Sequence, residues 1–246
     1  MKACPVKKIE FVGLPGAGKS TVAELVTAAL EARGFHCIDR ASYRCIVGAE
    51  HARHNPIRRK IGYLRYLLSH PTRLVHSLGF SIAQKPFVFN GLRRCYHLTR
   101  KLHNTDIFVR GGFASAVNAM LVLDQDLLQE IWGILYLRPM LEASELVRLL
   151  EALLEDLPDA IVYIKVDGQK ALARMGERRD LVGPIGDFDR GVGLDAKTLD
   201  RSATDFTRII EIAATVRGSL IIELDGCLSP EIQSAIVVAS LEAISP

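Results

Sequence analysis

A glycine-rich segment near the amino terminus, Gly13–Ser20, reads G-L-P-G-A-G-K-S and fits the pattern G-x-x-x-x-G-K-[ST] without a mismatch. Glycines let the backbone turn tightly and direct successive N–H groups at phosphate oxygens, and the helix that follows presents its positive end to the same charge. Lys19 is then expected to bridge terminal phosphates, Ser20 to hold Mg²⁺ and Thr21 to reach the α-phosphate. The pattern therefore predicts ATP and Mg²⁺ as cofactors. The residues predicted to bind the nucleotide are Gly13, Pro15, Gly16, Ala17, Gly18, Lys19, Ser20 and Thr21.

The elements that must position this loop follow from alternating apolar runs and helical patterns. Five strands are predicted, at Ile9–Gly13, His36–Asp39, Met120–Asp124, Ala160–Val166 and Leu220–Leu224. Helices are predicted at Lys19–Arg33, Leu127–Leu137, Glu142–Asp156, Gln169–Arg178, Asp195–Arg217 and Pro230–Ile244. Ile107–Val109 is a weaker competitor for the third strand, because it neither ends in an acid nor leads directly into a helix. Strands separated by helices predict a three-layer α/β sandwich with a five-stranded parallel sheet, whose ligands bind at the carboxyl ends of the strands.

The loop sequence Gly-x-Pro-Gly-Ala-Gly-Lys-Ser-Thr, so early in a short chain, resembles the P-loop kinases of the nucleoside monophosphate kinase and thymidylate kinase type. The resemblance extends over most of the chain and is sharp only at the loop. It implies a sheet in strand order 2-3-1-4-5 with a short lid. It also implies ATP- and Mg²⁺-dependent transfer of the γ-phosphoryl group to a small molecule.

In kinases of this type, a strand beside the phosphate loop ends in an acid that binds Mg²⁺ or accepts the acceptor's proton, and Asp124 matches that position. Phosphoryl transfer needs an oriented nucleophile and a held metal more than a strong base, so a carboxylate suits this place. Asp126 is the second candidate, and a helix N-cap is the alternative role for Asp124. Gln125 stands where related kinases usually have arginine, which leaves the acceptor open among nucleotides, nucleosides, sugars and other metabolites.

Arg174 and Arg178 lie four residues apart, on one face of the predicted helix that follows the fourth strand. The resemblance implies a lid at about 174–194 in which such arginines neutralise charge on the transferred phosphoryl group. Arg178 is the first candidate, followed by Arg174 and Arg179, and Arg190 lies within the glycine-rich part of the lid. The alternative is that these arginines pair with neighbouring acids on the surface.

The net charge of +3 conceals an uneven distribution. Residues 40–110 contain 14 Lys and Arg against two acids, Glu50 and Asp106. The resemblance places a helical acceptor-binding insertion here, at about 41–110, and the charge favours an anionic acceptor. Alternatives are a solvated helical surface, a nucleic-acid-associated or regulatory nucleotide-binding module, and attachment to anionic lipid surfaces through the helices around Ile61–Phe80. The candidate acceptor contacts are Arg40, Arg44, Arg53, Arg93 and Arg94.

A chain of 246 residues with 49% hydrophobic composition can form one large core, so a single domain spanning 1–246 is expected. The five cysteines are scattered and never form C-x-x-C, which argues against a disulfide framework and favours the cytoplasm. The amino terminus lacks the apolar core of a signal peptide, and no apolar run approaches the roughly 18 residues that span a bilayer. We therefore expect no membrane span. We also expect no stable nucleic-acid complex, and a homodimer is a candidate assembly.

Overall fold

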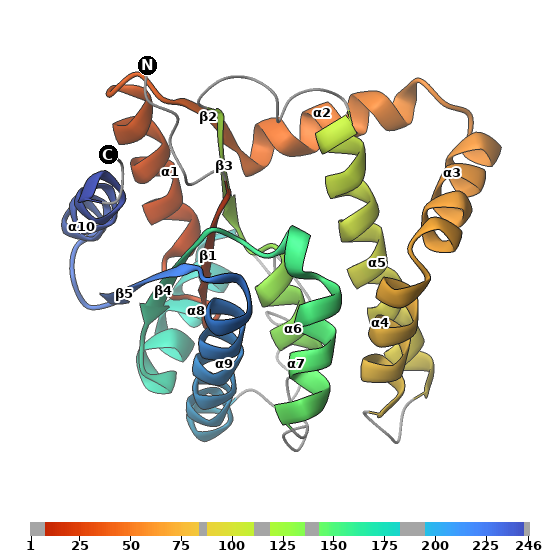
Figure 1. Ribbon diagram of the computed structural model, residues 1–246. Helices are drawn as coiled ribbons and strands as arrows, with labels where there is room; N and C mark the ends of the chain where they lie inside the picture. Colours follow the sequence, from red (N-terminus) through yellow and green to blue (C-terminus); the bar gives the residue numbers. More distant parts are fainter. Residues whose placement is uncertain (1–7, 84–87, 111–118, 136–142, 183–194, 244–246) are drawn as a thin grey trace.

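The computed structural model describes residues 8–83, 88–110, 119–135, 143–182 and 195–243. Its five strands form one sheet, in which every pair of neighbours is parallel and the order is β2-β3-β1-β4-β5 (Figure 1). This confirms the α/β class and the predicted order 2-3-1-4-5. The strands are β1 (Lys8–Gly13), β2 (His36–Asp39), β3 (Ala119–Asp124), β4 (Ala160–Lys165) and β5 (Leu220–Asp225).

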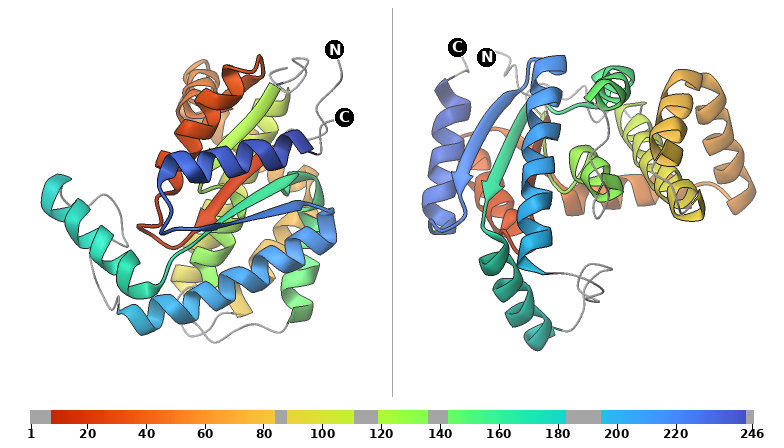
Figure 2. Two further views of the ribbon diagram at one scale, coloured as in Figure 1. Left: turned by 90° about the vertical axis from the view of Figure 1, so that its left-hand side faces the viewer. Right: turned by 90° about the horizontal axis from the view of Figure 1, so that it is seen from below.

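The central strand β1 is buried along almost its whole length because helices cover both faces of the sheet. α1 (Lys19–Glu31) and α10 (Pro230–Ala243) pack against each other on one face. On the other face lie α6 (Leu127–Leu135), α7 (Ala143–Ala152) and α9 (Ala196–Arg217), as Figure 2 shows. The described chain thus has the three layers that the sequence predicts.

Between β2 and β3, the described residues form four helices that make up a lobe beside the sheet, which we call the helical lobe (Figure 1). Pro56 and Pro71 begin α3 and α4, as expected of a residue that fits the first helical turn and disfavours helix before it. The helical lobe consists of α2 (Arg40–Ala52), α3 (Pro56–Ser69), α4 (Pro71–Ala83) and α5 (Val88–Arg110). The competing strand Ile107–Val109 is helical, within α5, so Met120–Asp124 was the correct choice.

Several predicted boundaries differ from the structure. The predicted helix Glu142–Asp156 is α7 followed by a separate 3-10 turn, Leu154–Asp156. The helix after β4, α8 (Gly168–Val182), continues four residues beyond Arg178, so the first part of the predicted lid is helix. Residues 183–194, which include Arg190, lie outside the described residues. In the described ranges, no helix combines the length and the apolar character needed to cross a membrane.

Candidate active site

The glycine-rich loop Gly13–Ser20 connects the buried end of β1 to the first turn of α1. Gly13, Gly16 and Gly18 have φ of 150°, 79° and 90°, which are values that L side chains rarely adopt. Gly18 occupies the N-cap position of α1 without offering a side-chain cap, and no acid lies in the first turn. The positive end of the helix therefore faces the loop, and α1 itself supplies neither a capping side chain nor an acid there, which suits a bound anion.

Two loop glycines also permit close packing against the fourth strand and the helix that follows it. A Cβ on Gly13 would lie 2.6 Å from the carbonyl oxygen of Ile164, and one on Gly16 would lie 2.7 Å from that of Ala171. Both contacts are to backbone, which cannot move away cheaply. The glycines thus hold the loop against β4 and α8, and this packing is independent of phosphate binding.

We expect Gly16→Ala to lower the free energy of unfolding by about 3 kcal/mol, because it adds a backbone overlap to an unfavourable positive φ. Gly34→Ala is the matched control, since Gly34 has φ of 85° and open space around the position of a Cβ. The control should lower the free energy of unfolding by only about 1 kcal/mol. Urea unfolding measures both, and equal losses would show that the contact with α8 contributes nothing.

Lys19 is only 4% exposed, although lysine is seldom buried. Its Nζ donates to the carbonyl oxygens of Gly13 and Leu14, each at 2.8 Å. The ammonium group therefore lies against the backbone of the loop itself, which places one full positive charge beside the helix N-terminus. This is where the sequence predicted a phosphate-bridging lysine.

Ser20 and Asp124 meet at the carboxyl edge of the sheet. Because Phe11 pairs with Asp124 in the β1–β3 register, the end of β3 lies next to the start of the loop. The Ser20 hydroxyl donates to Asp124 Oδ2 in a short hydrogen bond. The side chain of Asp124 is buried, and the Ser20 side chain is exposed. The structure thus brings together, at the first turn of α1, the hydroxyl and the carboxylate that the sequence analysis named as candidate Mg²⁺ ligands.

Arg40 completes this arrangement from the other side. Asp39 ends β2 and caps α2 by accepting from Ser42 N at 2.8 Å, so Arg40 begins the helix one strand away from Asp124. Its Nη1 lies 3.2 Å from both carboxylate oxygens of Asp124 and donates to the Asp124 carbonyl at 2.9 Å. Arg44 follows one turn later, and burial together with the charge of Arg40 lowers its pKa. Two of the predicted acceptor contacts therefore lie at the carboxyl edge of the sheet.

Asp126 and Asp124 lie only two positions apart but have different surroundings. Asp126 lies at the start of α6, where its carbonyl accepts from Glu130 at 3.1 Å, and its carboxylate forms an ion pair with Lys8 at 2.7 Å. Gln125 between them has φ of 70° and donates its N–H to the Phe11 carbonyl at 3.2 Å. This left-handed turn separates the two carboxylates. Geometry therefore favours Asp124 over Asp126 at the loop.

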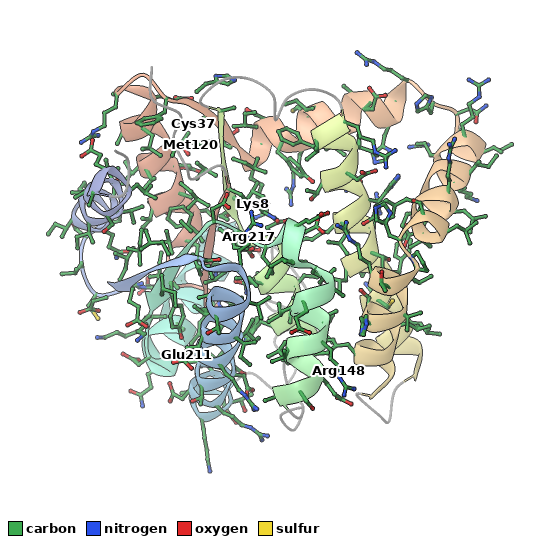
Figure 3. All side chains as sticks on the ribbon, viewed as in Figure 1. Lys8, Cys37, Met120, Arg148, Glu211 and Arg217 are labelled. Carbon is green, nitrogen blue, oxygen red and sulfur yellow. The ribbon has the colours of Figure 1, made fainter. Side chains whose placement is uncertain are left out.

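Lys8, Glu10 and Asp126 form a charged cluster in which the two acids are buried and Lys8 is partly buried (Figure 3 labels Lys8). Glu10 Oε1 accepts from the N–H groups of Asp126 and Gln129, each at 3.1 Å, and Lys8 Nζ donates to the Asp156 carbonyl at 2.7 Å. Burial and the nearby Asp126 charge raise the pKa of Glu10 to about 7. Although burial opposes it, the charges of Lys8 and Lys101 hold the pKa of Asp126 below its ordinary value. Sequence analysis missed this cluster, although charges at alternate positions of a buried strand were its signal.

The cluster predicts a pH dependence of stability. The folded state retains the Glu10 proton up to pH about 7, whereas the unfolded chain releases it near 4.5, so stability falls as pH rises through this window. The free energy of unfolding should fall by at most about 1.4 kcal/mol per pH unit. The test is urea unfolding of wild type and Glu10→Gln between pH 4.5 and 8. The free energy of unfolding of wild type should fall relative to that of Glu10→Gln as pH rises to about 7, and the difference should stay constant above pH 7. Glu24→Gln, on the surface of α1, should retain the wild-type decline, and parallel curves for wild type and Glu10→Gln would contradict the assignment.

The predicted arginines after β4 are only partly visible. Arg174 Nη2 donates to the Gly226 carbonyl at 2.8 Å, which joins α8 to the turn after β5. In the structure this guanidinium therefore contacts the turn after β5, at the β4–β5 end of the sheet. Arg178 and Arg179 belong to α8, but their side chains lie outside the described residues.

The remaining acceptor candidates lie elsewhere in the helical lobe. Arg53 is exposed and pairs with Glu50 at 2.7 Å, as a surface ion pair at the C-terminal end of α2. Arg93 is exposed on α5, and the Arg94 side chain is outside the described residues. Of the candidates whose side chains are described, Arg40 is the one that contacts Asp124 directly.

Among the residues that the structure describes, no group of three or more His, Cys, Asp or Glu side chains could hold a metal ion. A metal at this edge would instead depend on Ser20, Asp124 and oxygens supplied by a ligand or water. Comparison of the chain with protein-family models and with curated proteins found no match.

Proposed function

We propose that this protein is an ATP- and Mg²⁺-dependent kinase that transfers the γ-phosphoryl group to a small-molecule acceptor. The observation that carries the proposal is the Ser20–Asp124–Arg40 contact at the N-terminus of α1, directly beside the buried Lys19. The loop and Lys19 would suffice for nucleotide binding without phosphoryl transfer. The carboxylate and guanidinium at its side supply groups that phosphoryl transfer requires in addition.

The donor set fits Mg²⁺. The Ser20 hydroxyl and the Asp124 carboxylate are oxygen ligands, and Mg²⁺ commonly takes only one or two protein ligands and completes its shell with phosphate oxygens and water. When bound, Mg²⁺ would neutralise charge on the terminal phosphates. Asp124 serves either as its ligand or as the group that orients the acceptor hydroxyl.

The remaining roles follow from charge and position. The loop N–H groups and Lys19 bind the β- and γ-phosphates, and the α1 dipole adds to the attraction. Arg40 lies against both carboxylate oxygens of Asp124 and fixes the orientation of that side chain. Arg178 and Arg174 remain our candidates for neutralising the transferred phosphoryl group as the lid closes.

Arg40 and Arg44 lie close enough for their charges to repel, which favours an anion beside them. We therefore propose an anionic acceptor, such as a nucleotide or a sugar phosphate, ahead of a nucleoside or neutral sugar. The cytoplasm supplies ATP and Mg²⁺ and keeps thiols reduced, in agreement with the absence of a disulfide at the four cysteines that the structure describes, Cys37, Cys45, Cys95 and Cys227.

The direct test is incubation with labelled ATP and Mg²⁺ against a panel of nucleotides, nucleosides, sugar phosphates, sugars and polyols, followed by identification of labelled products. Acceptor-dependent ADP formation with one labelled product class is the expected result. Hydrolysis that no panel member stimulates would favour a regulatory ATPase, and salt-sensitive RNA or DNA binding would favour a nucleic-acid-associated module.

A further inference from the structure

The most unusual exposed surface of the molecule is one face of α3. Ile57, Ile61, Leu64 and Leu68 are 68%, 59%, 56% and 72% exposed. Their spacing of four, three and four places them on one side of a helix, so they form a continuous aliphatic stripe about 16 Å long. We call this surface the α3 stripe. Single exposed aliphatic residues are ordinary, but four in a row on one helix face are not.

The opposite face of α3 attaches the helix to the rest of the protein. Tyr66 is buried, and the Tyr63 hydroxyl shares a hydrogen bond of 2.5 Å with Thr99 of α5. Leu67 packs against the main core. The α3 stripe therefore points away from the protein because the tyrosine face is the one that is packed. Figures 1 and 2 show α3 at the outer end of the helical lobe, away from the sheet.

Cations border the α3 stripe on both sides. At 100° per residue, Lys60 and Arg65 lie about 70° from the centre of the stripe on opposite flanks, and Arg58 lies just beyond Arg65. All three are exposed. No acidic residue occurs between Glu50 and Asp106, so no carboxylate of α3, α4 or the greater part of α5 offsets these charges. The surface is an amphipathic basic helix whose apolar side faces outward.

We infer that the α3 stripe binds reversibly to an anionic membrane surface, with the axis of α3 parallel to the bilayer. Aliphatic side chains would enter the boundary between headgroups and acyl chains, while Lys60 and Arg65 would reach anionic headgroups on either side. A fluid bilayer surface can adapt to a convex ridge, whereas a protein partner would need a matching acidic groove. The inference does not depend on the proposed kinase activity.

Sedimentation of the full chain with vesicles tests the inference. Vesicles of phosphatidylglycerol and phosphatidylcholine should bind the protein, vesicles of phosphatidylcholine alone should bind it much less, and added salt should weaken binding. The double variant Ile61→Ser with Leu68→Ser should bind anionic vesicles about tenfold less tightly. Lys60→Ser with Arg65→Ser should cause a comparable loss and remove most of the salt dependence.

Ile232→Ser with Ile236→Ser is the matched control, because these residues are also exposed and aliphatic but lie on α10. The control should bind vesicles as wild type does. If the Ile61 and Leu68 pair impairs folding by circular dichroism, Ile57→Ser with Leu64→Ser tests the same stripe. Unchanged binding by a folded stripe variant, or equal binding to neutral vesicles, would overturn the inference. The inference would also be overturned if the wild-type protein were a dimer that does not bind vesicles and the stripe variant were a monomer. The stripe would then join two copies of the chain.

Discussion

Lys19→Ala is expected to lower acceptor-dependent phosphoryl transfer by about 10³-fold or more. The change removes the one buried ammonium at the loop, which we propose stabilises negative charge on the terminal phosphates as the bond breaks. ATP affinity should also weaken, because the loop N–H groups remain but the point charge is lost. Turnover by labelled-product formation and ATP binding by calorimetry measure the two effects separately.

The control for this prediction is Arg33→Ala. It also removes one cation, but just beyond the far end of α1, where Arg33 pairs with Glu242 on the surface. It should retain turnover near wild type, and both variants should keep the wild-type circular dichroism spectrum. A folded Lys19→Ala protein with wild-type turnover would refute the proposed kinase mechanism.

Asp124→Asn should lower turnover by about 10²- to 10³-fold. The substitution keeps the size of the side chain and an oxygen for the Ser20 hydroxyl, so the fold should be preserved while the charge at the edge is lost. If Asp124 holds Mg²⁺, the Mg²⁺ concentration for half-maximal activity should rise. If Asp124 orients the acceptor, the main effect should be on kcat at saturating Mg²⁺.

Asp106→Asn is the matched control, because Asp106 forms an exposed ion pair with Arg110 within α5. It should leave both turnover and Mg²⁺ dependence unchanged. If Asp124→Asn and Asp106→Asn lowered turnover by the same small factor, the Ser20–Asp124–Arg40 contact would support the fold without a role in catalysis. Comparison with Arg40→Gln adds a second measure, since that variant keeps the charge of Asp124 but removes the guanidinium that holds the carboxylate in place.

The helical lobe shows how far local patterns extend. Pro56 and Pro71 stand at the starts of α3 and α4 because the residue before proline disfavours helix, which is a local steric effect. The arrangement of these helices was not predictable, since it depends on which side chains pack across the chain. The α3 stripe illustrates this: its periodicity is readable in the sequence, but a periodic apolar face normally turns inward. Only the packing of Tyr63 and Tyr66 shows that this one faces outward.

The amino-acid sequence alone predicted the glycine-rich loop, the five strands and the parallel α/β class, because glycine freedom and apolar period act over a few neighbouring residues. It also identified Asp124 as the acid at the end of the third strand. Tertiary packing, in contrast, brings Asp124 into contact with Ser20 and Arg40, which lie 104 and 84 positions away along the chain. Likewise, it assigned Asp126 to a buried pair with Lys8 and Arg174 to the turn after β5. Such contacts depend on strand order and helix packing, which join distant segments that no local pattern connects.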